Sequence, residues 1–221
     1  MGVDTELLAR SPLFRDFTPE QLNSIAEHAE ERRLVRGDQV FNEGDQPDSM
    51  YIVDRGRVAI ANKSKWDSRE SVLALMEHGD LFGEMGLLDG LGRSAEARAL
   101  EASVIYAIPY EPVRDVFDKQ PELLWGVVEL LAGRLRTTDE ALADSVFLDV
   151  TGRTAKRLLE LAGDRDEFTL PITQEELAGM VGASRERVNK AIAAFIRLGW
   201  LEQHERHYRI RDRDKIAGRA R

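Results

Sequence analysis

The chain of 221 residues contains no cysteine. Disulfide bonds, thiolate nucleophiles, cysteine-ligated iron–sulfur clusters and cysteine-rich zinc sites are therefore excluded. Histidine is also scarce, with four residues, and the sequence holds no Ser/His/Asp set and no Walker-type phosphate loop. We accordingly expect neither an enzyme nor a metal site.

Long hydrophobic runs are missing as well. No segment approaches the roughly 20 apolar residues that a helix needs to cross a bilayer. The first residues, MGVDTELLARSPLF, lack the basic start and the apolar core of a secretory signal. With 43% hydrophobic residues the chain can still bury an ordinary core. We expect a cytoplasmic protein that does not enter a membrane.

Positive charge is in deficit overall, since the formal net charge is −9. It is unevenly distributed, however. Residues 151–221 contain 15 Lys and Arg against 11 Asp and Glu, whereas the balance of residues 1–150 is −13. A basic C-terminal third behind an acidic body favours a polyanionic partner for that third. Chance asymmetry is the alternative.

Short β-type runs separated by glycine turns occupy the chain from Leu34 to Pro109. The runs are QVFNEG, SMYIVDRG, RVAIAN, SVLALMEHGD and SVIYAIP. Such close and regular spacing predicts an antiparallel barrel or roll. Ahead of them, Thr18 followed by Pro19 is typical of a capped helix start.

The residues after Pro121 predict one long helix that ends near Phe147. A heptad pattern runs along it for three repeats, and its second half includes polar residues. A helix that packed only on its own domain would carry a broader apolar stripe, so we expect a homodimer through a two-stranded coiled coil. The seam consists of Leu124, Val128, Leu131, Leu135, Thr138, Leu142 and Ser145.

Residues 172–202, ITQEELAGMVGASRERVNKAIAAFIRLGWLE, have the pattern of a helix-turn-helix. Thr173 and Glu176 form a capping box, Gly182 permits a sharp turn, and Ser184 caps the second helix. Asp149 is the expected cap of the preceding helix, which runs to about Ala162. The expected inward-facing residues are Leu177, Ala178, Val181, Val188, Ile192, Phe195 and Ile196.

The outward face of the second helix carries residue types that read base edges: Arg185, Glu186, Asn189 and Lys190. Arginine bonds guanine in bidentate fashion, and glutamate accepts from the amino group of cytosine. The following segment, GWLEQHERHYRIR, predicts two short strands around a polar tip, as in a β wing. A helical hairpin with a solvated charged face is the alternative.

A glycine-rich stretch, FGEMGLLDGLGRSAEARAL at residues 82–100, places Glu84 and Arg93 between closely spaced glycines. With this stretch, the chain resembles the cyclic-AMP receptor protein (CRP/FNR) family of bacterial transcription regulators over essentially its whole length. The resemblance rests on RGDQVFNEGDQPDSMYIVDRGRVAI, FGEMGLL with GRSAEA, FLDVTGRTAKRLLELA and ITQEELAGMVGASRERVNKAI. The last third looks closest to actinobacterial members.

The resemblance implies an α+β fold with three parts. Residues 1–120 would form a cyclic-nucleotide-binding antiparallel β-roll, residues 121–148 a dimerisation helix and hinge, and residues 149–221 a winged helix-turn-helix. By the same resemblance, a bound nucleotide shifts the population toward a state in which the segment 147–150 hinges the DNA-reading parts outward. RNA polymerase is the further partner that the family implies.

The ligand implied by the resemblance is a cyclic nucleotide, with cAMP as the first choice and no other cofactor. Arg93 and Ser94 would bond the phosphate, and Glu84 would accept from the ribose 2′-hydroxyl. Mutual pairing of Glu84 with Arg93 is the alternative. The complete implied site is Gly83, Glu84, Met85, Arg93, Ser94 and Ala95, with Thr138 and Asp139 at the base.

Asp139 departs from the family's cAMP pattern, which more often has Ser or Asn there. Because an aspartate only accepts hydrogen bonds, it also suits the two neighbouring donors of guanine. Cyclic GMP or a larger guanine nucleotide is therefore the rival effector, unless Asp139 faces solvent. A ligand-independent regulator is a second alternative, and a regulatory module of an enzyme or channel is a distant third.

For DNA, the resemblance implies phosphate contacts from Thr173, Gln174 and Ser184. Arg185 and Glu186 match base-contacting positions, and Lys190 stands where the family often has arginine. Lysine keeps the charge but loses the bidentate geometry, so this contact should discriminate less between bases. We expect a palindromic operator in double-stranded DNA with TGTGA-like half-sites about one helical turn apart.

Overall fold

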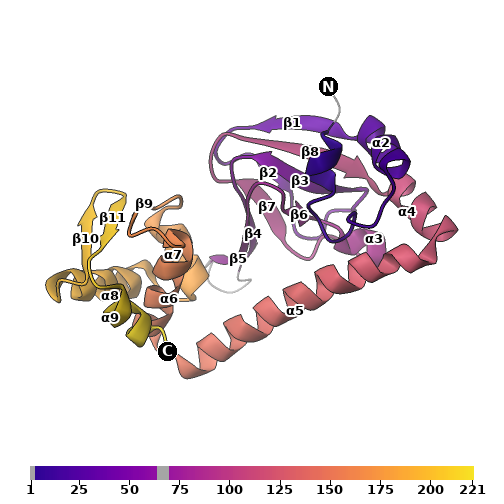
Figure 1. The fold of residues 1–221 in the computed structure, drawn as a ribbon. Helices are drawn as coiled ribbons and strands as arrows, with labels where there is room; N and C mark the ends of the chain where they lie inside the picture. Colours follow the sequence, from indigo (N-terminus) through magenta and orange to yellow (C-terminus); the bar gives the residue numbers. More distant parts are fainter. Residues whose placement is uncertain (1–2, 64–69) are drawn as a thin grey trace. The chain divides into compact units, whose positions relative to one another are not determined.

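The computed structural model describes residues 3–63 and 70–221, and Figure 1 shows their fold. The chain divides into two compact units. The first contains residues 1–62 and 73–136, and the second contains residues 63–72 and 137–221. No helix of the described residues is long and apolar enough to traverse a bilayer.

Two four-stranded sheets form the body of the first unit, where the defined registers are antiparallel (Figure 1). The expected antiparallel roll is thereby confirmed. In order across the sheet, the first is β1 (Glu30–Leu34), β8 (Ser103–Pro109), β3 (Ser49–Arg55) and β6 (Leu81–Phe82). The second is β2 (Gln39–Phe41), β7 (Glu96–Ala99), β4 (Val58–Lys63) and β5 (Glu70–Met76).

The core of the roll lies between its sheets and under its helices. Tyr51, Phe82 and Ala97 belong to the buried cluster that the two sheets share. On β3, the first five residues are all buried. Tyr51 and Val53 belong to the cluster between the sheets, whereas Met50 and Ile52 belong to the cluster under the helices. These are α1 (Thr5–Leu8), α2 (Pro19–His28), α4 (Tyr110–Lys119) and the start of α5. Two covered faces explain why the run MYIV, residues 50–53, is continuously apolar.

A short 3-10 turn, η1 (Pro121–Leu123), leads into α5 (Leu124–Phe147), which confirms the predicted long helix. Gly126 allows the N-terminal segment to lie against this helix, since a Cβ there would stand 2.4 Å from the Pro12 carbonyl oxygen. In the single chain, the apolar residues of the seam are between 41% and 63% exposed. They are Leu124, Val128, Leu131, Leu135 and Leu142.

The second unit contains a helical core and a three-stranded sheet. Its elements are α6 (Val150–Ala162), β9 (Glu167–Thr169), α7 (Gln174–Val181), α8 (Arg185–Arg197), β10 (Leu201–His204), β11 (His207–Ile210) and α9 (Arg213–Arg219). The strands are ordered β10–β11–β9, so the predicted two-stranded wing is present and gains a third strand. Neither β9 nor α9 was expected from the sequence.

Burial in this unit follows the predicted helical faces with one exception. Leu177, Val181 and Val188 are at most 2% exposed, and Ile192 and Phe195 are also buried. Ile196 is 39% exposed, so its assignment to the inward face was wrong. The buried face of α8 consists of Val188, Ala191, Ile192 and Phe195. At about 100° per residue, Ile196 lies at the edge of this face and stays partly exposed.

Candidate functional site

The glycine-rich stretch forms a tight loop and a short helix between β6 and β7. Gly83 has a φ of +78°, and a Cβ at this position would lie 2.8 Å from Nη1 of Arg93. Glycine is therefore required both for the backbone conformation and for the approach of the guanidinium. The next residue, Glu84, precedes α3 (Met85–Asp89), which ends at Gly90 in the left-handed conformation.

Glu84 is completely buried. Its Oε1 accepts a hydrogen bond of 2.5 Å from Nη1 of Arg134, on α5, while Nη2 of Arg134 donates to the Leu81 carbonyl at 2.8 Å. The second carboxylate oxygen, Oε2, is buried and has no hydrogen-bond partner among the described residues. Glu84 is thus paired with Arg134, and the mutual pair of Glu84 and Arg93 is not formed.

Arg93 is also buried, and its guanidinium is directed at protein acceptors. Nη1 donates to the Gly83 carbonyl at 2.7 Å and to the Tyr110 hydroxyl at 3.0 Å, and Nη2 donates to the Ser49 carbonyl at 2.6 Å. The guanidinium carbon lies 4.2 Å from the centre of the Phe41 ring. Nε is buried and has no partner among the described residues.

Tyr110 completes this network from the first residue of α4, and its hydroxyl donates to the Gly83 carbonyl. Burial raises the pKa of the Tyr110 hydroxyl above its ordinary value, although the neighbouring Arg93 guanidinium opposes the shift. The hydroxyl is therefore protonated at neutral pH and can act as this donor.

The remaining predicted ligand residues differ in exposure. Ser94 is exposed, and its hydroxyl lies 3.6 Å from the sulfur of Met85, which is 44% exposed. Ala95, the residue after Ser94, is buried. The structure therefore brings Gly83 against Arg93 and Met85 against Ser94. Thr138 and Asp139 are exposed residues of α5 that belong to the second unit.

Two residues that form side-chain hydrogen bonds in this site, Arg134 and Tyr110, were missed in the sequence. Arg134 stands four residues before Thr138 on α5, so the two share a helix face, and this spacing was an available signal. Tyr110 carried no such signal, because its partners Arg93 and Gly83 are 17 and 27 residues away in the chain.

In the second unit, the local chemistry of the helix-turn-helix agrees with the prediction. Thr173 and Glu176 form the capping box at the start of α7, and Gly182 adopts a φ of +66° at its end. The Ser184 hydroxyl oxygen accepts from the Arg187 backbone N–H at 3.4 Å and caps α8. Both capping hydroxyls act as acceptors here, so each retains its O–H as a donor.

The outward face of α8 is open. Arg185, Glu186, Asn189 and Lys190 are exposed, and none of them makes a side-chain hydrogen bond or ion pair within the described part of the chain. Two fixed turns of helix thus present three donor side chains and one carboxylate without internal partners. Such groups are available to base edges and phosphates.

Gln174 is the least available of the predicted phosphate contacts. Its Nε2 donates to the Tyr208 hydroxyl at 2.6 Å, which joins the start of α7 to the wing strand β11. Burial raises the pKa of Tyr208 above its ordinary value, with an opposing effect of this hydrogen bond. Oε1 of Gln174 is buried and unpartnered among the described residues.

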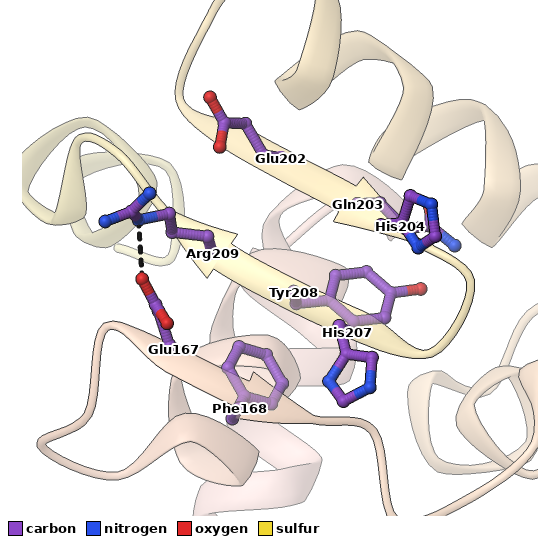
Figure 2. A pocket seen from close by; sticks show the side chains of 8 residues that line it. All are labelled: Glu167, Phe168, Glu202, Gln203, His204, His207, Tyr208 and Arg209. Atoms are coloured by element: carbon purple, nitrogen blue, oxygen red, sulfur yellow. Dashed lines mark ion pairs between the residues drawn. The ribbon is translucent and has the colours of Figure 1, made fainter.

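A shallow hollow of about 490 Å³ lies on the wing sheet, and Figure 2 shows the side chains around it. Arg209 pairs with Glu167 at 2.8 Å across the sheet, and His207 Nδ1 lies 2.9 Å from the Thr169 hydroxyl. His204 stands opposite His207 in the hairpin register. Among the described residues, no group of three or more potential ligands is placed to hold a metal ion.

Two segments of the chain match known families. Residues 31–120 match the cyclic nucleotide-binding domain, and residues 152–219 match the Crp-like helix-turn-helix domain. The first match contains Glu84 and Arg93. The second contains α7, the turn at Gly182 and α8.

Relatives extend the similarity along the chain. The CRP-like cAMP-activated global transcriptional regulator of Mycobacterium tuberculosis is 36% identical over 223 residues, which cover 98% of this chain and 99% of that protein. The cAMP-activated global transcriptional regulator CRP of Salmonella typhimurium is 34% identical over 160 residues, 69% of this chain and 76% of that protein. Among solved structures, the c-di-GMP-responsive regulator CLP of Xanthomonas campestris is 26% identical with a TM-score of 0.76, covering 87% of this chain and 99% of that one.

Proposed function

The chain belongs to the CRP/FNR family of transcription regulators, and from that premise we propose that it binds cyclic AMP in its first unit and an inverted-repeat DNA site through its second. Cyclic AMP is the preferred effector because the relatives from M. tuberculosis and Salmonella are named as cAMP-activated.

One observation carries the proposal. The loop around Gly83 holds a buried acceptor, Oε2 of Glu84, and a buried donor, Nε of Arg93, and neither has a partner among the described residues. Burying a polar atom without a hydrogen bond is unfavourable, so a ligand that forms hydrogen bonds with these two atoms would be stabilised by them. A cyclic nucleotide supplies both partners, since its ribose hydroxyl can donate to Glu84 and an anionic phosphate oxygen can accept from Arg93.

The donors of Arg93 support the same assignment. A guanidinium has five N–H groups, and the hydrogen bonds to Gly83, Tyr110 and Ser49 use three of them. The two that remain are one on Nε, which has no partner among the described residues, and one on Nη2. An arginine N–H is a charge-assisted donor that suits a phosphate oxygen. The internal bonds therefore fix the guanidinium and still leave donors for an anion.

We assign Gly83, Met85, Ser94 and Ala95 to the same pocket. The Ser94 hydroxyl has the Met85 sulfur as its acceptor. Because a thioether is a weak acceptor, little is lost when this hydroxyl turns to a phosphate oxygen. Ionised Glu84 suits a ribose hydroxyl because it only accepts hydrogen bonds.

Thr138 and Asp139 are proposed to meet the base. Asp139 can accept from the exocyclic amine of adenine, but it can equally accept from the two adjacent donors of guanine. Cyclic GMP is therefore the competing effector, and a direct comparison of the two nucleotides decides between them.

We propose that the active species is a homodimer through α5. The exposed seam from Leu124 to Leu142 supports this, because its apolar side chains keep the 3.5-residue period of a two-stranded coiled coil. A two-fold dimer presents two α8 helices, so the operator is an inverted repeat with TGTGA-like half-sites. RNA polymerase is the proposed partner at the promoter.

Calorimetric titration with cAMP and with cGMP, followed by DNA-binding measurements with each, tests the proposal. The variants Glu84→Gln and Ser94→Ala should bind the effector more weakly. Losing a hydrogen bond to a charged group corresponds to about a 10- to 100-fold weaker affinity for Glu84→Gln. Because Ser94 is exposed, the Ser94→Ala variant carries little risk to folding.

Arg57→Gln is the matched control. Arg57 is an arginine of the same unit, but it forms surface ion pairs with Glu77 and Glu101 instead of facing the loop at Gly83. Its replacement should leave nucleotide affinity unchanged. If neither nucleotide produces heat of binding, or if Glu84→Gln binds as the parent does, the assignment of this pocket is wrong.

A further inference from the structure

Tyr110 supplies the one side-chain acceptor that Arg93 uses within the described part of the chain. The other two acceptors are the main-chain carbonyls of Gly83 and Ser49. We propose that Tyr110 is a positioning residue, whose hydroxyl holds the Arg93 guanidinium in the orientation that receives the nucleotide phosphate. The inference rests on the proposed function, because it concerns the affinity of the same pocket.

The Tyr110 hydroxyl, the Gly83 carbonyl and Nη1 of Arg93 form a closed triangle of hydrogen bonds. Nη1 donates at 3.0 Å to the hydroxyl and at 2.7 Å to the carbonyl, and the hydroxyl donates to the same carbonyl. A tyrosine hydroxyl has one proton. Because that proton is directed at Gly83, the hydroxyl oxygen faces Arg93 as an acceptor. The triangle therefore fixes the direction from which Nη1 approaches the loop.

The hydroxyl is carried by a well-anchored part of the backbone. β8 ends at Pro109, and Tyr110 is the first residue of α4. Ser49 pairs with Pro109 in the first sheet, and the Tyr110 N–H donates to the Asp48 carbonyl at 2.9 Å. The Ser49 carbonyl accepts from Nη2 of Arg93 at 2.6 Å. Two backbone segments that are bonded to each other thus hold both ends of the guanidinium.

The other neighbours of Arg93 attract its guanidinium without setting its rotation. The guanidinium carbon lies 4.2 Å from the centre of the Phe41 ring. An aromatic face attracts a cation, but it does not specify how a planar guanidinium is turned within its own plane. Hydrogen bonds are directional and do specify this rotation. The hydroxyl also has its space reserved, since a Cβ at Gly86 would stand 3.0 Å from its oxygen.

Tyr110→Phe tests this role because it removes a single oxygen atom. The Gly83 carbonyl keeps its bond from Nη1 of Arg93, so neither of these groups loses its last partner. The large cost of an unpaired buried group is therefore avoided, and we expect the variant to fold as the parent does. Its guanidinium is less constrained before binding, however, and the nucleotide must then order it.

Calorimetric titration with cAMP measures the consequence. Immobilising one long side chain on binding corresponds to an affinity about 2- to 10-fold weaker, and this is the loss that we expect in Tyr110→Phe. Thermal unfolding of the same variant should stay close to that of the parent, because the buried groups around the hydroxyl remain paired.

Tyr106→Phe is the matched control. Tyr106 lies on β8 of the same unit, and its hydroxyl makes no hydrogen bond within the described part of the chain. Its charged neighbours are Glu31, Arg33, Asp54 and Arg55, none of which we assign to the pocket. The control removes the same atom from the same residue type, so it should leave the affinity for cAMP unchanged.

Nuclear magnetic resonance of the arginine side chains gives a readout that needs no ligand. A guanidinium held by directional hydrogen bonds rotates slowly and shows separate Nη1 and Nη2 signals, whereas a free one shows averaged signals. The signals that disappear in Arg93→Lys identify Arg93. We expect separate signals in the parent and in Tyr106→Phe, and broadened or averaged signals in Tyr110→Phe. A contribution of Tyr110 to stability alone would not change them.

The outcomes separate this inference from the proposed function. Parental cAMP affinity in Tyr110→Phe, an equal loss in Tyr106→Phe, or averaged Arg93 signals already in the parent would each overturn the positioning role. If neither nucleotide binds the parent, the proposed function is rejected instead. Separate Arg93 signals that average in Tyr110→Phe would even then support Tyr110 as the residue that orients this guanidinium.

Discussion

Replacing Arg134 with methionine removes the cation that is hydrogen-bonded to the buried Glu84 carboxylate. Glu84 is 0% exposed, and one of its oxygens is already without a partner among the described residues. Breaking a buried ion pair by removing one member typically costs about 3–5 kcal/mol, because the remaining charge stays buried. The Arg134 side chain is 35% exposed, so we expect the low end, about 3 kcal/mol.

Scanning calorimetry measures this effect. For a chain of this length, 1 kcal/mol corresponds to about 2–4 °C in Tm, so Arg134→Met should melt roughly 6–12 °C below the parent. The double variant Glu84→Leu, Arg134→Met buries no charge and should recover most of the loss. That recovery distinguishes a stranded carboxylate from simple loss of packing.

Glu129→Gln is the matched control on the same helix. It breaks the ion pair with Arg15, whose side chains are 52% and 51% exposed. Water already solvates these charges, so the change in stability should be much smaller than for Arg134→Met. A drop in Tm below about 2 °C for Arg134→Met, or an equal drop for both variants, would refute the reasoning.

Three further predictions concern other parts of the chain. Gly126→Ala should destabilise by about 1–3 kcal/mol in thermal unfolding, because its Cβ meets the Pro12 carbonyl at 2.4 Å. Gly133→Ala, on the same helix with nothing within 4 Å of the new Cβ, should instead stabilise by up to about 1 kcal/mol. Ser184→Ala should lose about 1 kcal/mol of unfolding free energy and Ser184→Gly only a few tenths, because both remove the capping hydroxyl but glycine is a much better N-cap residue than alanine. Glu186→Ala should relax base selection at one position by about 1–3 kcal/mol, measured with a panel of operator variants; undiminished selection at every position would place Glu186 away from the bases.

Features that depend on residues three or four apart could be predicted from the sequence. The capped helix start at Thr18, the capping box at Thr173, the cap at Asp149 and the sharp turn at Gly182 are all present. Each is a contact between near neighbours in the chain, so the local residues alone define it. The heptad period likewise predicted α5.

Strands without an apolar pattern were missed. β1 has the sequence EERRL and is mostly exposed at the edge of its sheet, so it shows no alternation. β7, with the sequence EARA, lies inside the second sheet between β2 and β4. Its small and charged residues gave no β-type run, and only pairing with its neighbours makes it a strand.

The sequence alone determined which residue types stand at positions 84 and 93, a carboxylate and a guanidinium. It also determined the caps, the turn at Gly182 and the exposed polar face of α8. Tertiary structure decided which partners these groups take. Arg134 meets Glu84 across 50 residues, and Ser49 meets Arg93 across 44. Such pairs form only once the sheets and α5 have packed, because chain neighbours cannot specify a contact that depends on the position of distant backbone.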